Sequence, residues 1–587
     1  MIRPLRLIAL LSFAARLLAQ TSAQVPTIEA IFAEGGITGR APEALQWSPD
    51  DSKFSFIQRD DSGDHGELWY VDAASGKKKV LVSEVKLAAL APSRTNMKDE
   101  REKERLNRYH VEDYQWAPDS KHLMFDSEGQ LWYFTLENGT GVQITSNPDP
   151  STDPKLSPGG ERVAYVRKHN LYVRPLSGEH ETQLTKDKDE NLLNGEVDWV
   201  YAEELNARSH YFWSPSGKEI AFLQMDETQV PTYPIVDWLA PHATVDMQKY
   251  PQAGDANPAV RIGVVGSGGG KTKWISLTDE KDIYIPRFGW VREGLLWAEV
   301  LNRVQDKMDL YFVDTHSGDA KKVLTETAPD SWVNVNDDFK VTGNRFLWTS
   351  WRDGHTHLYL YSFDALRPLA EARLERQLTQ GDFEVLGVQG VSGDTVYFSC
   401  NKGDPRQTHL CSVKLDGSGL RKVTSEEGSH GIKFAHESAR YADTFSAAAT
   451  PPSLSICSEE AACHKVWESR EVAGFTSPIF LEFKAEDGTT LYGELSLPLA
   501  AKGKIPVIVD IYGGPAAQTV LNEWGGSGLF FNQVLLNHGF AVFSVDNRGT
   551  PNRGRKFGSA IRHEFGAIEL KDQLASLDQL LAQYPQL

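Results

Sequence analysis

Positively charged residues are in short supply in this chain of 587 residues. Its 61 lysines and arginines face 80 aspartates and glutamates, which gives a formal net charge of −19. Because negative charge repels phosphate backbones, this balance argues against a nucleic acid partner and fits a well-solvated surface. The hydrophobic content of 40% is ordinary for a globular protein, and the length predicts two or more domains.

Cysteine is scarce as well. The four cysteines are Cys400, Cys411, Cys457 and Cys463. No CxxC pair occurs among them, which argues against a zinc site, and we expect neither a metal nor another cofactor. An even number of cysteines permits disulfides if the chain is exported. Pairing of sequence neighbours is one arrangement, but the sequence does not fix the connectivity.

Long hydrophobic runs are missing beyond the N-terminus. No later segment approaches the ~18 apolar residues that a membrane-spanning helix needs, so no membrane span is expected. At the N-terminus, Arg3 and Arg6 precede an apolar stretch at residues 7–15, and small residues would allow cleavage after Ala19 or Ala23. This order predicts a signal peptide at residues 1–23 and export to the periplasm or the cell exterior. The alternative is an N-terminal helix of the mature protein.

Short repeated elements fill the middle of the chain. In one of them, an aromatic or apolar residue precedes Ser-Pro or Ala-Pro; it begins at Trp47, Trp116, Leu156 and Trp213. Each occurrence is followed by a strand-like run, as in Glu219-Ile-Ala-Phe-Leu. The spacings of 69, 40 and 57 residues are irregular and imply long insertions between strands.

These repeats favour a β-propeller. Pro and Gly end one strand and turn the chain, and alternating apolar residues bury a face of the next strand. Units this small cannot bury their own apolar faces, so they have to stack around an axis. We therefore expect a mostly β protein with an eight-bladed propeller over residues 24–472, the eight blades being supplied by the resemblance described below. A pair of β-sandwiches is the alternative.

The pattern changes near residue 475. Two segments that start at Pro478 and Thr490 resemble a hairpin, and near-continuous apolar runs at residues 505–512 and 541–546 are typical of buried strands. Leu570, Leu574, Leu577 and Leu581 then share one face of an amphipathic helix. Strand, loop, strand and helix in this order predict the first part of an incomplete α/β sheet over residues 473–587.

Two adjacent carboxylates carry the strongest indication of chemistry. Glu203 and Glu204 lie in Asp198-Trp-Val-Tyr-Ala-Glu-Glu-Leu. Ionised carboxylates on a fixed segment can bind one cation, such as the free α-ammonium group of a peptide. Without further context, paired glutamates are more often a solvated helix face.

The context of the pair resembles the dipeptidyl peptidase IV family. The same segment continues into Phe212-Trp-Ser-Pro-Ser-Gly, and further similar stretches begin at Gln224, Tyr250, Val509 and Asp546. The family consists of serine exopeptidases of the prolyl oligopeptidase clan, with an eight-bladed propeller beside an α/β-hydrolase domain. The resemblance implies release of N-terminal dipeptides with Pro or Ala in second position, substrates with a free N-terminus held by Glu203 and Glu204, and a homodimer.

Two further site residues follow with less support. Tyr512 occurs in Val509-Asp-Ile-Tyr-Gly-Gly-Pro, where the family has a tyrosine that donates a hydrogen bond to the oxyanion. The alternative is a tyrosine at the strand end with its hydroxyl group in water. The family also uses an arginine for the substrate carbonyl. Arg105 is the candidate, although it lies in a charged stretch that also fits a solvated helix.

The catalytic serine is the main departure from the family. An α/β-hydrolase needs Gly-x-Ser-x-Gly, followed by an acid and a histidine, and the 587 residues contain no such motif. The order of strands would place it one strand beyond Leu587. We therefore expect these residues to lack the Ser/Asp/His triad and to be inactive as they stand. The alternative is a non-enzymatic exported propeller that binds peptides or a partner protein.

Overall fold

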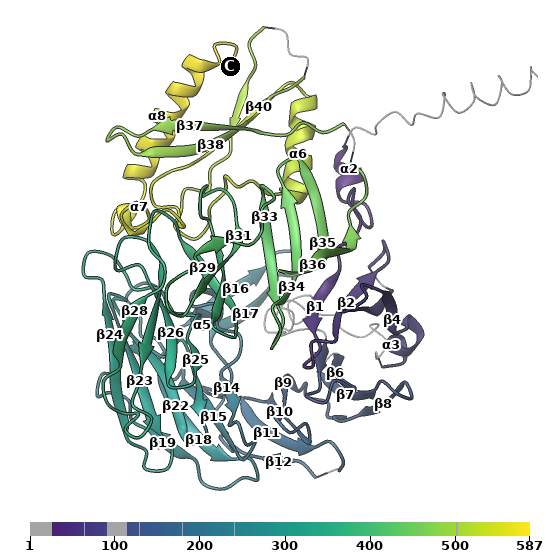
Figure 1. The fold of residues 1–587 in the computed structure, drawn as a ribbon, viewed down its shortest axis with the longest axis vertical. Coiled ribbons are helices and arrows are strands. Elements are labelled where there is room, and N and C mark those ends of the chain that lie inside the picture. Colours follow the sequence, from purple (N-terminus) through teal and green to yellow (C-terminus); the bar gives the residue numbers. More distant parts are fainter. Residues whose placement is uncertain are drawn as a thin grey trace, which may run out of the picture.

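The computed structural model of the chain describes residues 26–587 except 64, 91–113, 128, 179, 240, 460, 473 and 500–502. The predicted signal peptide at residues 1–23 lies outside these residues and stays a prediction. Figure 1 shows two parts: a large body of β-sheets and, at the top of the view, a smaller part that contains helices and the C-terminus.

Eight antiparallel sheets of four or five strands, here called blades 1 to 8, follow one another along the described chain. Blades 1 to 4 consist of β1 (Glu43–Trp47), β2 (Lys53–Arg59), β3 (Gly66–Asp72) and β4 (Lys78–Val82); β5 (Tyr114–Trp116), β6 (His122–Ser127), β7 (Gln130–Thr135) and β8 (Thr140–Gln143); β9 (Thr152–Leu156), β10 (Arg162–Arg167), β11 (Asn170–Pro175) and β12 (Thr182–Gln183); and β13 (Leu192–Asn194), β14 (Tyr211–Trp213), β15 (Glu219–Asp226), β18 (Ala259–Gly266) and β19 (Lys273–Ile275). Blades 5 to 8 consist of β20 (Ile283–Tyr284), β21 (Phe288–Arg292), β22 (Leu295–Asn302), β23 (Lys307–Asp314) and β24 (Ala320–Thr327); β25 (Lys340–Thr342), β26 (Arg345–Ser350), β27 (His357–Ser362) and β28 (Arg373–Gln377); β29 (Val385–Ser392), β30 (Thr395–Cys400), β31 (His409–Lys414) and β32 (Arg421–Lys422); and β33 (Ser429–Phe434), β34 (Arg440–Ala447), β35 (Thr450–Ser458) and β36 (Ala461–Glu468).

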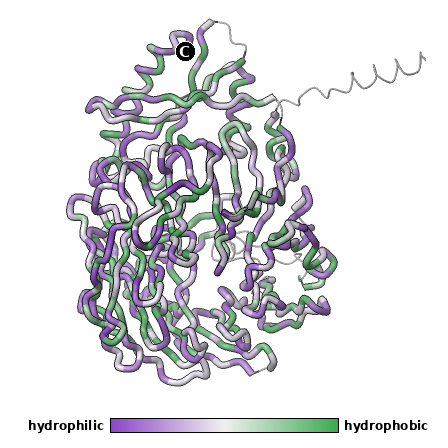
Figure 2. Tube along the Cα trace, viewed as in Figure 1, coloured by the Kyte–Doolittle hydropathy of each residue, from purple (hydrophilic) through white to green (hydrophobic). Residues whose placement is uncertain are grey.

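Burial along a strand depends on its place in the blade. The six central residues of β15 are all buried, because neighbouring blades cover both faces of a blade. The outer strand β4 instead exposes its first three residues. Hydrophobic and hydrophilic residues accordingly interleave along the strands of the large body (Figure 2). The short strand-like runs in the sequence are therefore real strands.

The blades form a closed ring. Each blade shares a buried apolar cluster with the next one along the chain. The last and first blades also share such a cluster, in which Trp47 and Phe54 of blade 1 pack with Leu454 of blade 8. The predicted eight-bladed propeller is confirmed, and the pair of β-sandwiches is wrong.

Among the described residues no strand of blade 1 pairs with blade 8, so side chains and loops close the ring. The indole N–H of Trp47 donates to the carbonyl oxygen of Lys433 at 2.9 Å. The Asp51 carboxylate accepts the backbone N–H groups of His436, Glu437 and Ser438 at 2.8–2.9 Å. These hydrogen bonds connect the first blade of the propeller directly to the last one.

Two insertions interrupt blade 4, as the irregular spacing of the repeats predicts. The helix α5 (Trp199–Glu203) lies between β13 and β14. A two-stranded arm, β16 (Thr232–Asp237) and β17 (Thr244–Lys249), lies between β15 and β18. The arm is largely exposed, and the side chains of Trp238 and Leu239 at its tip are 80% and 98% exposed.

The smaller part is an α/β sheet with the strand order β37-β38-β40-β39. The hairpin of β37 (Ile479–Lys484) and β38 (Thr490–Ser496) is confirmed, and β40 (Ala541–Asp546) is fully buried as predicted. The parallel pair of β39 (Val507–Val509) and β40 is connected through a helix, α6 (Gly526–Asn537), where the sequence predicts only a loop. Glycines at the start of α6, which are poor helix formers, hide it in the sequence.

The predicted strand at residues 505–512 is wrong in extent and burial. Only the three residues of β39 form a strand, and all three are half-buried, because β39 has a neighbour on one side alone within the described sheet. The residues after it are exposed, including Ile511 at 53%. The apolar run therefore marks a sheet edge.

The last helix is present, but its leucine face is not the one that packs. The helix α8 (Ala567–Gln583) exposes Leu570 at 58% and Leu574 at 52%. Its buried face is mostly polar, because Asp572 binds Arg548 and the Gln573 side chain donates to the Val545 carbonyl oxygen. Side-chain partners outside the helix, rather than its periodicity, decide which face is covered.

Other short helices complete the described chain: α2 (Ile28–Ile31), α3 (Glu84–Leu90), α7 (Arg555–Gly558) and the 3-10 helix η2 (Ser559–Ile561). Although it precedes blade 1, α2 packs on α6 of the smaller part through Ile31. No helix among the described residues is long and apolar enough to cross a membrane.

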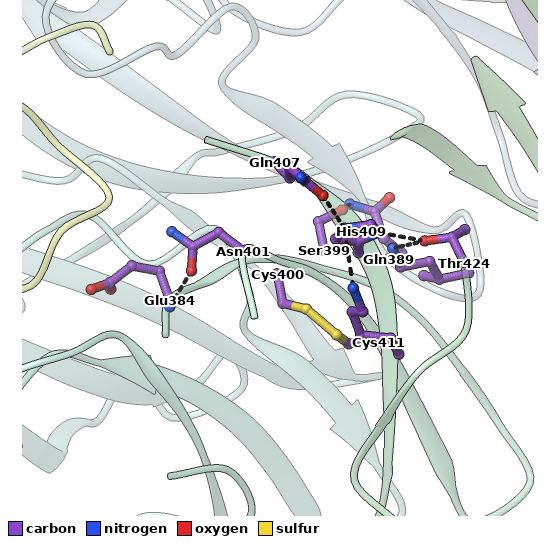
Figure 3. The surroundings of a disulfide bond; sticks show 11 residues. Glu384, Gln389, Ser399, Cys400, Asn401, Gln407, His409, Cys411 and Thr424 are labelled. Atoms are coloured by element: carbon purple, nitrogen blue, oxygen red, sulfur yellow. Dashed lines mark hydrogen bonds between the residues drawn. A yellow bond between two sulfur atoms is a disulfide. The ribbon is translucent and has the colours of Figure 1, made fainter. Parts of the chain in front are cut away.

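Both disulfides join sequence neighbours. Cys400 of β30 pairs with Cys411 of β31, and Cys457 pairs with Cys463. Figure 3 shows the first disulfide beside His409, whose ring also contacts Gln407 and Thr424. Each bridge links adjacent strands of one blade, so it reinforces a local pairing rather than the ring.

The two parts meet through backbone and cation–π contacts. The backbone N–H of Arg555 donates to Gly354 of blade 6 at 2.6 Å, and that of Asn522 donates to Arg406 at 2.7 Å. The Arg406 guanidinium also lies 4.8 Å from the ring centre of Tyr492 on β38. The loop that follows β39 is therefore tied to the propeller.

The ring closure yields a stability prediction. Replacing Asp51 with alanine removes the carboxylate that accepts three backbone N–H groups of blade 8 and should cost about 2–3 kcal/mol of unfolding free energy at pH 7. Burial raises the pKa of Asp51, but the three backbone N–H groups outweigh it and hold the pKa below its usual value. The carboxylate therefore stabilises the fold above about pH 4, and its contribution is lost as the pH falls further.

Thermal unfolding followed by tryptophan fluorescence would measure the loss. Asp50→Ala is the matched control, because the hydrogen bonds of the Asp50 side chain stay within its own turn, with Ser48 and Ser52. An equal loss in both variants at pH 7, or a difference between Asp51→Ala and wild type that does not shrink as the pH is lowered below about 4, would contradict this account of the closure.

Candidate functional site

The helix α5 is short but firmly started. Asp198 is its N-cap, and a carboxylate oxygen of Asp198 accepts the backbone N–H of Tyr201 at 2.9 Å. Burial raises the pKa of Asp198 to about 6, although backbone N–H donors favour its ionised form. The cap fixes where α5 begins and hence where Glu203 and Glu204 lie.

Buried residues fix the orientation of α5. The Tyr201 side chain is 1% exposed, and its hydroxyl oxygen accepts the backbone N–H of Ile285, in blade 5, at 2.7 Å. On another side, the ring of Trp199 lies 4.4 Å from that of Tyr250, at the base of the arm. The helix is therefore attached to blade 5 and to the arm, although it belongs to blade 4.

Glu203 and Glu204 lie together at the exposed end of this anchored helix. Glu203 is the last residue of α5, and Glu204 is its C-cap, whose backbone N–H donates to Val200 at 2.8 Å. Both residues are exposed. Two negative charges are thus presented to solvent by a segment with little freedom to move, which suits the capture of a cation.

The chain then reverses and brings a positive charge to this pair. Asn206 adopts the left-handed backbone conformation with φ of 47°, and the backbone N–H of Ala207 donates back to Tyr201 at 2.8 Å. Arg208 follows, with Nη1 3.9 Å from Oε1 of Glu203. Arg208 is not among the site residues predicted from the sequence; its place four residues after the glutamate pair was the available signal.

A second buried acid lies near Asp198. Glu227, at the end of β15, is 8% exposed, and its backbone carbonyl oxygen accepts the ammonium group of Lys249 at 3.0 Å. Burial, together with the nearby charge of Asp198, raises the pKa of Glu227 to about 7. The raised pKa favours the neutral acid near pH 7, so Glu227 adds little negative charge to the region around α5.

Tyr512 lies in the smaller part, three residues beyond the end of β39. Its side chain is 51% exposed, and its ring lies beside Gly514, where an added Cβ would come within 3.3 Å of Cε1. Gly513 has a φ of 79°, a conformation that favours glycine, and its carbonyl oxygen accepts the Asn547 side chain at 3.2 Å. The turn is thus specified by its glycines and held by the loop after β40.

Salt bridges hold that supporting loop. Arg548 binds Asp572 of α8 at 2.7 Å and Asp487, in the turn between β37 and β38, at 2.8 Å. The Arg548 backbone N–H also donates to Asp572 at 2.9 Å. Two separate segments, α8 and the turn between β37 and β38, therefore fix the loop that supports Tyr512.

The structure brings Glu203 and Glu204 together on α5 and places Tyr512 in the other part of the molecule. Arg105, the candidate for the substrate carbonyl, lies outside the described residues. Its role, like those of the other three residues, stays a prediction.

Comparison with known proteins decides the family. The family model described as "Dipeptidyl peptidase IV (DPP IV) N-terminal region" matches residues 117–452, which is more than half of the chain. This chain belongs to the dipeptidyl peptidase IV family. The prolyl oligopeptidase family model matches residues 528–587, within the smaller part.

Named relatives agree with this family. Dipeptidyl-aminopeptidase B of Aspergillus niger is 29% identical over 495 residues, covering 76% of this chain and 54% of the relative. Dipeptidyl peptidase 4 of Trichophyton rubrum is 27% identical over 489 residues, covering 76% of this chain and 61% of the relative. The chain thus spans little more than half the length of the curated relatives it matches.

A solved structure supports the fold. The crystal structure of Porphyromonas gingivalis dipeptidyl peptidase 4 superposes with a TM-score of 0.79 at 23% identity, covering 95% of this chain and 78% of that one. At this identity the likeness concerns the fold: a propeller beside an α/β part.

Proposed function

We propose that this protein is an exported serine-type exopeptidase that releases dipeptides from peptide N-termini, with Pro or Ala preferred in second position. Its described residues would carry the subsite for the peptide's free amine. The observation that carries the proposal is the pair Glu203 and Glu204, two exposed carboxylates at the end of a helix fixed by Asp198 and Tyr201. The family membership and the names of the relatives support the reaction class.

The chemistry divides between the two parts. A protonated N-terminus would bind the glutamates through charge-assisted hydrogen bonds, which position the peptide by its end. A phenol such as Tyr512 can donate a hydrogen bond to the oxyanion that forms when a nucleophile attacks a peptide carbonyl group. A substrate that uses all three residues would lie between the propeller and the α/β part, which the contacts of Arg406 and Arg555 hold together.

Cleavage itself needs groups that these residues do not supply. The 587 residues contain no Gly-x-Ser-x-Gly motif. By themselves they are therefore proposed to bind peptides and leave them intact. The same observation favours the second candidate function, an exported propeller that binds peptides or a partner protein without catalysis.

Export is part of the proposal. The two disulfides are of the kind that persists in oxidising compartments, such as the periplasm or the cell exterior. The basic and apolar N-terminus fits a signal peptide.

Amine recognition predicts a binding difference. A Gly-Pro peptide with a free N-terminus should bind more tightly than its N-acetylated form by about one to two decades, since one charge-assisted contact is worth roughly 1.5–3 kcal/mol. Glu203→Gln and Glu204→Gln should each reduce this ratio, and the double variant should nearly abolish it. The ratio should also fall above about pH 8, where the peptide amine loses its charge.

Fluorescence anisotropy or calorimetry would measure the ratio. Glu219→Gln, a charge change on β15 outside the site, is the control and should leave the ratio unchanged. Equal binding of the free and acetylated peptides by the wild-type chain would contradict the proposed amine subsite.

The missing motif predicts the outcome of a turnover assay. The purified 587-residue chain should release no chromophore from Gly-Pro- or Ala-Pro-type substrates, because no activated serine is present to attack the peptide bond. An active relative of the family in the same assay is the positive control. Turnover that survives repeated purification and is stopped stoichiometrically by a serine-directed phosphonate would refute this.

A homodimer, implied by the family resemblance, is also proposed. The arm of β16 and β17 is the surface that fits, because it presents Trp238 and Leu239 to solvent together with Tyr233, Val245 and Met247, which are 46%, 57% and 56% exposed. Sedimentation velocity should detect a dimer that the double change Trp238→Asp and Leu239→Asp dissociates. A monomer at all concentrations, or a dimer indifferent to these changes, would overturn the assignment.

A further inference from the structure

The cation beside the glutamate pair has no part in the function proposed so far. Arg208 Nη1 lies 3.9 Å from Glu203 Oε1, and the two side chains are 40% and 35% exposed. An ion pair with this exposure adds little to the stability of a fold. Its position beside the amine subsite calls for a different explanation.

The backbone that carries Arg208 is fixed on both sides. The preceding residue, Ala207, is buried and donates its N–H to Tyr201 of α5 at 2.8 Å. The following residue, Ser209, donates its hydroxyl group to the Asp153 carboxylate of blade 3 at 2.5 Å. Arg208 therefore projects from an anchored segment, and the place of its charge relative to Glu203 is built into the fold.

The geometry of an N-terminal residue gives this charge a target. The α-ammonium group and the side chain of that residue leave the same Cα atom, so a group that contacts the side chain has to lie within a few ångströms of the amine subsite. The guanidinium of Arg208 meets this condition, because it already lies within ion-pair distance of Glu203.

We infer that Arg208 selects for the side chain of the peptide's first residue, favouring an acidic side chain and disfavouring a basic one. This inference rests on the proposed amine subsite. In that arrangement the glutamates hold the ammonium group, and Arg208 meets the carboxylate of an N-terminal Asp or Glu. Guanidinium groups suit this role because they stay charged and can donate two hydrogen bonds to one carboxylate.

Charge balance around the site gives the inference a sharp consequence. Without Arg208, an acidic first residue would lie beside Glu203 and Glu204, whose negative charges would repel it. Removal of the arginine should therefore weaken the binding of an acidic peptide while sparing its neutral isostere.

Two peptides that differ only in Asp or Asn before Pro test this on the 587-residue chain. The ratio of their dissociation constants, Asn over Asp, should fall about two- to fivefold from wild type to Arg208→Gln, the range expected for one partly exposed ion pair. Arg208→Lys, which retains the charge, should restore most of the ratio. The effect should also be larger at ~0.01 M salt than at 0.5 M, since salt screens charges.

Arg367→Gln is the matched control, because Arg367 forms a similar exposed ion pair with Asp364 in blade 6 and lies outside the site. It should leave the ratio unchanged. Melting curves of all variants would show that each is folded. A ratio unaffected by Arg208→Gln, or an equal loss for both peptides, would overturn the inference and leave Arg208 as a structural partner of Glu203.

The acetylated forms of both peptides separate the two hypotheses. If wild-type protein does not distinguish free from acetylated peptides, the amine subsite itself is wrong. If it does distinguish them, but Arg208→Gln does not alter the preference for Asp over Asn, only the role of Arg208 is wrong.

Discussion

The packing of blade 8 against blade 1 is the constraint on which the rest of the structure depends. Because no strand pairing between these two blades occurs among the described residues, the seam is closed by an apolar cluster, by the Trp47 indole, by the three hydrogen bonds to Asp51 and by the ion pair of Arg470 with Asp61. Every blade buries both faces against its neighbours, so an opening at this seam would expose the apolar residues on either side of it. The helix α5 is attached to blade 5 through Tyr201, so its position depends on the packing of blade 4 against blade 5.

Much of the fold is predictable because β-strands and turns are encoded locally. The Ser-Pro and Ala-Pro elements and the runs after them correspond to real strands, and the change of pattern near residue 475 marks a real second part. The errors arise where long-range partners decide. Asp572 of α8 is buried because it binds Arg548, and this orientation of the helix leaves Leu570 exposed. The strand β39 is only half-buried because it lies at an edge of the described sheet.

The candidate site shows the same division. Glu203 and Glu204 stand out in the sequence because the residues around them form a recognisable segment. The surroundings of the two glutamates cannot be recognised in the sequence. The left-handed turn at Asn206 and the approach of Glu227 from another strand result from the folding of the chain. Contacts between residues that are distant in the sequence produce no periodicity or spacing in the sequence from which they could be predicted.

The exposed leucines of α8 have a consequence for how the protein behaves in solution. Leu570 and Leu574 form an apolar stripe on the same helix that uses its polar side for packing. At low ionic strength the net charge of −19 keeps copies of the chain apart. Added salt weakens that repulsion while leaving the attraction between apolar stripes in place. Self-association of the chain thus depends on the balance between repulsion from its net charge and attraction between the exposed leucines of α8. The ionic strength of the buffer decides which of the two dominates.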